Sequence, residues 1–113
     1  MANTFKVKTK AAVGTSITTV YTVPSSTTAI VLGLIVGNVT GSAVNATVHV
    51  ETNTSDTETN VNVELVTNAP IPAGGSLELL SGNKVVLQET DVLKVTSDTA
   101  SSIDACLSFM EIT

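Results

Sequence analysis

The stretch that decides the fold is AIVLGLIVG at residues 29–37, the longest uninterrupted apolar run in the chain. Its four β-branched members favour a pleated sheet over a helix, and its two glycines would each weaken a helix by about 1 kcal/mol relative to alanine. The run is also shorter than the ~20 residues of a bilayer-spanning helix. It predicts a central strand buried on both faces, by a second sheet on one side and by further protein, such as another copy of the chain, on the other.

Further segments on both sides of this run also read as strands, and several of them alternate between apolar and polar residues, the pattern of half-buried strands. They lie at residues 4–11, 16–23, 43–51, 60–67, 76–80, 84–88, 92–97 and 102–112. Turn signals recur roughly every 8–12 residues, and no helical periodicity is present. This pattern predicts a single all-β domain over residues 1–113, an antiparallel β-sandwich of about eight strands. A jelly roll and an immunoglobulin-like Greek key both fit.

The alternation also predicts which side chains face the core. In residues 60–67 it places Val61, Val63 and Leu65 inward. Residues 68–75 hold two prolines and two glycines, so they are predicted to be neither helix nor central strand. In the last segment one face is fully apolar and carries Ile103, Ala105, Leu107 and Phe109. The other face is only partly apolar and carries Cys106, Met110 and Ile112.

The amino-terminal residues 1–12 are expected to form an edge strand or arm. The two faces of this segment differ sharply, with Lys6, Lys8 and Lys10 on one and Phe5, Val7 and Thr9 on the other. A row of lysines commonly protects an exposed sheet edge from pairing with other chains, with the charges facing solvent. The alternative is a basic arm that lies on an acidic partner.

Composition counts against several classes of function. The chain carries ten acidic residues, five lysines and no arginine, a formal net charge of −5. Arginine is the preferred ligand for phosphates and guanine edges, so its absence counts against nucleic-acid binding. Aromatic residues are only 3% of the chain, too few to build stacking platforms. Charged residues make up 13%, and such a weakly charged surface suits close packing against neighbouring proteins.

Catalytic and metal-binding patterns are missing from the sequence. His49 is the only histidine and is expected to be a solvated strand residue, because no second histidine is present to share a metal. Cys106, the only cysteine, is expected to be a small buried apolar group. The acidic pairs in residues 56–58 and 89–91 lack the glycine-bearing spacing of a calcium loop and are expected to be solvated turns. We therefore expect no enzyme activity, metal or cofactor.

Three stretches carry a resemblance to a known family. They are PSSTTAIVLGLIVGNVTG (24–41), APIPAGGSLELLSGNKVVLQETDVLKVTS (69–97) and SSIDACLSFMEIT (101–113). Together they resemble small virion structural proteins of tailed bacteriophages that infect marine bacteria or cyanobacteria. Relatives tend to carry a glycine-aspartate pair in the last hairpin, where this chain has Thr90-Asp91. This departure leaves the type of that turn open.

The resemblance implies a non-enzymatic protein present in many copies on the outside of the capsid, assembled in the host bacterial cytoplasm. The first expectation is a decoration or cement protein that bridges major capsid subunits. A head-fibre, neck, tail or fibre component, or a carbohydrate-binding or adhesion module, is the alternative. Nucleic acid and membrane are not expected as partners.

We further expect a homotrimer with residues 29–37 or 102–112 nearest its axis, because closed rings satisfy a repeated heterologous contact. The lysine-bearing strand is expected to touch the shell or a neighbouring copy. The candidate interface residues are Phe5, Lys6, Val7, Lys8, Lys10, Ile35, Met110 and Ile112.

Overall fold

The computed structural model describes residues 2–52, 60–80 and 84–113. Over this part of the chain it consists of nine strands joined by turns and loops, without a helix. The strands are β1 (Asn3–Val13), β2 (Thr18–Thr22), β3 (Thr28–Asn38), β4 (Val44–Glu51), β5 (Val63–Ile71), β6 (Ser76–Leu79), β7 (Val85–Leu87), β8 (Val92–Ser97) and β9 (Ile103–Ile112). The predicted all-β fold is confirmed.

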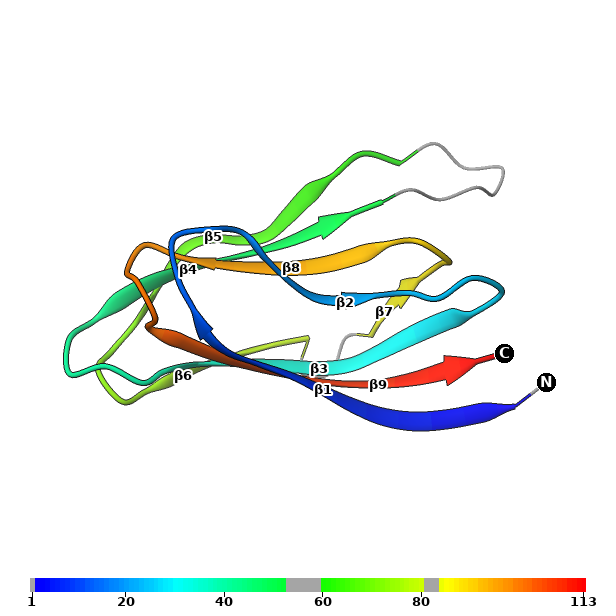
Figure 1. The fold of residues 1–113 in the computed structure, drawn as a ribbon, viewed down its shortest axis with the longest axis horizontal. Helices are drawn as coiled ribbons and strands as arrows, with labels where there is room; N and C mark the ends of the chain where they lie inside the picture. Colours follow the sequence, from blue (N-terminus) through cyan, green and yellow to red (C-terminus); the bar gives the residue numbers. More distant parts are fainter. Residues whose placement is uncertain (1, 53–59, 81–83) are drawn as a thin grey trace.

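The strands form two antiparallel sheets that face each other (Figure 1). Sheet A has the order β1-β9-β3-β6, with β7 also paired to β3, and sheet B has the order β2-β8-β4-β5. Each sheet interleaves strands from the beginning, the end and the middle of the chain. This strand order is that of a jelly roll, one of the two topologies that the sequence left open.

The core lies between the sheets and centres on the pairing of β3 with β9. β3 is a central strand, as predicted, with β9 on one side and β6 and β7 on the other. The predicted inward face of β9 is also confirmed, because its four apolar members are all buried. The inward side chains of the two strands are Ala29, Val31, Leu34 and Val36 from β3, and Ile103, Ala105, Leu107 and Phe109 from β9.

The opposite face of β3 is not covered by any described part of the chain. Ile35 is 45% exposed there, and Ile30 is half-buried. The predicted burial of this strand on both faces is thus met on one face only within a single chain.

The prediction for β5 was wrong in two respects. Val61 and Val63 are exposed rather than buried, and the strand continues beyond residue 67 to Ile71. The register between β4 and β5 shifts twice near Val48, so the simple alternation does not carry along the strand. Pro70 is tolerated because β5 is an edge strand, where a missing N–H costs no ladder bond.

Asn38, at the end of β3, ties the two sheets together. Its buried side-chain amide donates hydrogen bonds to the carbonyl oxygens of Ile71, at 3.1 Å, and of Ser42 and Pro72, at 2.8 and 3.2 Å. Its Oδ1 accepts bonds from the backbone N–H and the hydroxyl of Thr40. One side chain therefore holds the β3–β4 turn, the end of β5 and the following turn in place.

We expect Asn38→Ala to lower the free energy of unfolding by about 2–3 kcal/mol, because it removes the buried hydrogen bond to the Ile71 carbonyl together with the bonds to the two adjoining turns. Urea unfolding of the variant and the wild type at neutral pH measures the difference. Asn45→Ala, a matched change at a half-buried asparagine in β4, is expected to cost much less. A loss at Asn38 within 0.5 kcal/mol of that at Asn45 would contradict this role.

Candidate functional site

The outer face of sheet A carries a row of apolar side chains that crosses four strands. Phe5 of β1 pairs with Met110 of β9, Met110 pairs with Ile30 of β3, and Ile30 pairs with Val86 of β7. Residues in register on adjacent strands point to the same side of a sheet. The two ends of the row are the most open, with Phe5 72% and Val86 59% exposed. We call Phe5, Met110, Ile30 and Val86 the apolar row.

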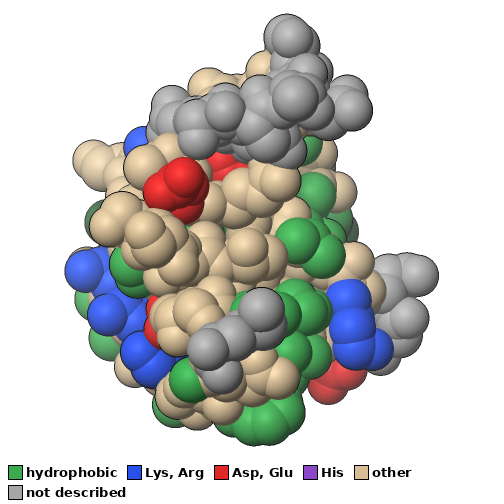
Figure 2. Space-filling model, turned by 90° about the vertical axis from the view of Figure 1, so that its right-hand side faces the viewer, with side chains coloured by type: hydrophobic (Ala, Val, Ile, Leu, Met, Phe, Trp, Pro, Cys, Tyr) green, Lys and Arg blue, Asp and Glu red, His purple; other side chains and the backbone are tan. Residues whose placement is uncertain are grey.

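Further apolar groups extend this face along the strands. Val7 and Ile35 are exposed, and Ile112 is half-buried. Because Gly37 has no side chain, a shallow hollow of about 430 Å³ lies beside Ile35, lined also by Cys106 and Asp104. Cys106 is half-buried at this hollow, so the prediction of a buried group was wrong. In the end-on view, hydrophobic side chains gather along the lower edge of the molecule, where sheet A lies, with charged side chains to either side (Figure 2).

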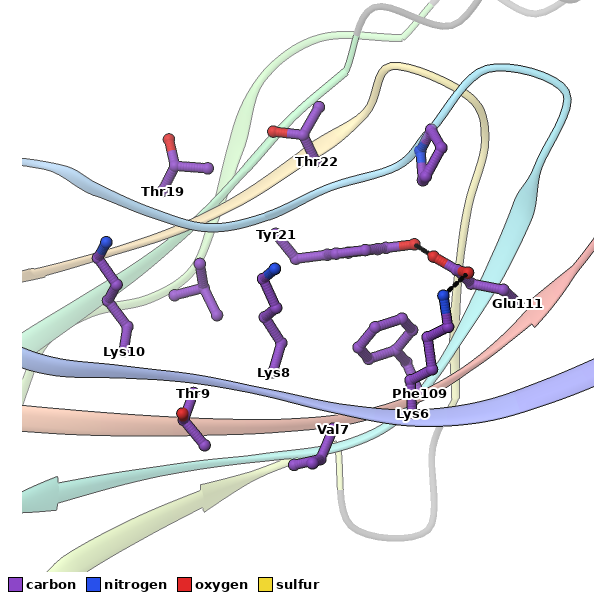
Figure 3. Close-up of a pocket in the computed structure, with 12 residues that line it drawn as sticks. Lys6, Val7, Lys8, Thr9, Lys10, Thr19, Tyr21, Thr22, Phe109 and Glu111 are labelled. Carbon is purple, nitrogen blue, oxygen red and sulfur yellow. Dashed lines mark hydrogen bonds and ion pairs between the residues drawn. The ribbon is translucent and has the colours of Figure 1, made fainter.

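The lysines of β1 occupy the opposite side of the strand. Lys6, Lys8 and Lys10 pair in register with inward-facing residues of β9, so they point into the space between the sheets. This side of the sandwich is open, because β1 and β2 are the edges of their sheets. A groove of about 660 Å³ results, with the three lysines, Tyr21 and Glu111 among its lining residues (Figure 3). We call it the lysine groove.

Glu111 is the acidic residue at the floor of the lysine groove, and its side chain is only 7% exposed. One carboxylate oxygen lies 2.7 Å from Lys6 Nζ, and the other accepts a hydrogen bond of 2.6 Å from the Tyr21 hydroxyl. The hydrogen bonds from Lys6 and Tyr21 lower the pKa of Glu111 despite its burial. Burial and the neighbouring carboxylate raise the pKa of Tyr21. The Tyr21 ring packs at 4.3 Å on Phe109, which anchors the cluster to the core.

The groove is a positive region on an acidic protein. Glu111 is the only acidic residue among those that line it, and it neutralises one lysine. Among the described residues, Lys8 and Lys10 form no ion pair, whereas Lys94 on sheet B is paired with Glu51 at 2.9 Å. Lys8 and Lys10 are therefore an uncompensated local charge in a chain whose net charge is −5.

Other predicted candidates do not form a chemical site. His49 is half-buried rather than solvated, with Nε2 bonded to the Thr96 hydroxyl and Nδ1 3.8 Å from Glu64. In the 89–91 turn, Asp91 is buried and accepts a hydrogen bond from the Gln88 N–H, so the prediction of a solvated turn was wrong there. Residues 56–58 lie outside the described part of the chain.

Within the described ranges, no group of three or more histidine, cysteine or acidic side chains could hold a metal ion. A search of the same ranges finds no helix that is long and apolar enough to cross a membrane.

The predicted interface residues thus separate onto two surfaces. Phe5, Val7, Ile35, Met110 and Ile112 share the outer face of sheet A, and the three lysines line the groove. Sequence reasoning missed four contributors: Ile30 and Val86, which complete the apolar row, and Tyr21 and Glu111, which form the floor of the groove. Ile30 could have been found from its place in the apolar run. The other three depend on pairings between distant strands.

Comparison of the chain with protein-family models, with curated proteins and with solved structures gives no match. The function of the chain is therefore inferred from the surfaces described above and from the chemistry of their side chains.

The low pKa of Glu111 predicts how stability depends on pH. Stability from the ionised carboxylate is present above the ordinary pKa of about 4.3 and is lost as the pH falls through the lower pKa of the folded protein. We expect Glu111→Gln to destabilise the protein by about 1–3 kcal/mol at pH 7, and this difference should shrink towards pH 3.

Urea unfolding at both pH values measures this difference. Glu78→Gln, at an exposed carboxylate of β6, serves as the matched control and should change little. An equal difference between Glu111→Gln and wild type at pH 7 and pH 3 would rule out the ionised carboxylate as its source.

Proposed function

We propose that this chain is a non-catalytic structural component of a tailed-phage virion, a decoration or cement protein that bridges major capsid subunits on the outside of the shell. The observation that carries the proposal is the apolar row on the outer face of sheet A. Its side chains stand in register on four strands, and its ends are largely exposed. Contiguous apolar surface of this kind is typical of protein–protein contacts.

The size of the row suits a contact that is weak in one copy and strong in an array. Full burial of one large apolar side chain contributes roughly 1.5–3 kcal/mol, and part of that gain is lost to the entropy of association. A single contact of four side chains is therefore modest. Repeated over a shell, and made to two subunits at once, such contacts add up without any single tight site.

The two segments considered for the centre of a homotrimer lie on neighbouring strands. β3 and β9, which include the candidate segments 29–37 and 102–112, are neighbours in sheet A. Both contribute to the same outer face, so a trimer axis near either strand would draw on one continuous surface. We propose that this face is divided between contacts to sister copies and contacts to the shell.

Two further features support an assembly role. The jelly roll is common among viral capsid proteins, although the fold alone does not define a function. The three stretches that resemble small virion proteins span β3, β6 to β8, and β9. They include every strand of sheet A except β1. The resemblance therefore includes three of the four strands that carry the apolar row.

Electron cryomicroscopy of particles from a phage that encodes this sequence tests the proposal. We expect the protein at regular positions on the head, with the outer face of sheet A against a neighbour. Phe5→Thr combined with Val86→Thr should remove it from the head, because the exposed ends of the row lose their apolar contact. Both changes keep good strand-forming residues at exposed positions, so the unfolding midpoint should stay near that of the wild type.

Val61→Thr is the matched control, since Val61 is 73% exposed but lies outside sheet A. It should leave occupancy unchanged. Density confined to the tail would refute the decoration role, and absence from the particle would refute the virion role. Full occupancy by the double variant would show that the apolar row is not the contact.

A further inference from the structure

The free edge of β1 offers backbone hydrogen bonds as well as charge. Ala2 and Thr113 exchange two backbone bonds, of 3.1 and 3.0 Å, at the start of the β1–β9 ladder. Such doubly bonded pairs alternate with non-bonded pairs in an antiparallel ladder, and the register is regular up to Lys10. The N–H and C=O groups of Phe5, Val7 and Thr9 therefore point away from β9, towards the free edge.

The side chains beside this edge determine which strand can pair with it. A strand added to β1 would place its inward-facing side chains next to Lys6, Lys8 and Lys10, because neighbours in register share a face. Pairing of β1 with the β1 of a second copy would bring lysines together, which is unfavourable. A strand with acidic residues at every second position would instead bring a carboxylate beside each lysine.

We propose that the lysine groove is a docking site for an extended acidic segment of a partner protein, which adds as a strand to the free edge of β1. The occupant carries carboxylates at alternate positions, matching the two-residue spacing of the lysines. The groove has room for it, at about 660 Å³. Lys8 and Lys10 form no ion pair within the described chain, so their charges are available to a partner.

A peptide fits these observations better than another polyanion. Phosphate or sulfate polymers could pair with the lysines, but they would leave the N–H and C=O groups of Phe5, Val7 and Thr9 without strand partners. Strand addition satisfies both the backbone groups and the lysines, with main-chain bonds for affinity and side chains for specificity. The side of the groove opposite β1 is β2, the edge strand of sheet B, so the added strand would close the open side of the sandwich.

This inference rests on the proposed function, because the acidic segment would belong to the protein on which this chain assembles. The experiment separates the two. The probe is a synthetic peptide with aspartate at every second position between valines, and binding is followed by NMR with hydrogen exchange. The control peptide has the same composition with its three aspartates adjacent.

We expect the alternating peptide to bind and to slow amide exchange at Phe5, Val7 and Thr9 by about tenfold, with little change at Lys6 and Lys8. Affinity should fall as salt is added, since the lysines are exposed. Lys8→Glu combined with Lys10→Glu should weaken binding by about tenfold or more. Lys6 is kept, because it holds the buried Glu111.

Lys84→Glu, the same substitution at one exposed lysine outside the groove, should bind the peptide like the wild type. Three results would overturn the inference: no binding, equal binding of the control peptide, or binding without slowed exchange at Phe5, Val7 and Thr9. If exchange at these amides became slower with increasing protein concentration in the absence of peptide, β1 would be pairing with a second copy. That result would also overturn the inference. If peptide binding fails while the protein still occupies phage heads, only this inference is lost.

Discussion

The antiparallel ladder between β3 and β9 is the constraint on which the rest of the molecule depends. It joins segments more than 60 residues apart and runs from Thr28–Ile112 to Asn38–Ile103. Because side chains alternate along both strands, one ladder creates two surfaces at once. Its inner side supplies much of the buried core, and its outer side aligns Met110 with Ile30 at the centre of the apolar row. Stability and the candidate interface thus come from the same pairing.

The edge strand β1 adds the second constraint. A strand at this position would ordinarily turn apolar side chains inward, yet it presents lysines there and Phe5 and Val7 outward. Inward-pointing charge is a known way to keep a sheet edge from pairing indiscriminately. Glu111 and Tyr21 accommodate one lysine and leave the others exposed. The sandwich therefore stays open along this side, and Phe5 and Val7 of the same strand are exposed on the outer face of sheet A.

Much of the fold could be predicted from the sequence, because period-two alternation is a local signal. It located the central strand, the inward face of β9 and the two faces of β1. It failed in β5, where Val63 is exposed although it pairs with Val50, and it could not choose a topology, because strand order depends on long-range pairing. Five of the candidate interface residues share the outer face of sheet A in the structure, but the sequence did not show which side of the sandwich each of their faces would take. Two further features depend on the register between strands, which a single sequence does not show. They are the position of Val86 at the end of the apolar row and the ion pair between Glu111 and Lys6.

The central claim is that the outer face of sheet A is covered by protein in the assembled state, and Cys106 tests it most directly. This single cysteine lies at the hollow beside Ile35, half-buried in the free chain. The measurement is the rate at which a bulky maleimide modifies Cys106 in the dilute free protein and in intact phage particles. The account predicts modification at least about tenfold slower in the particle, while a cysteine placed at Val61 in a Cys106→Ala background reacts equally in both. Equal rates at Cys106 would show that this face remains open to solvent and would contradict the account.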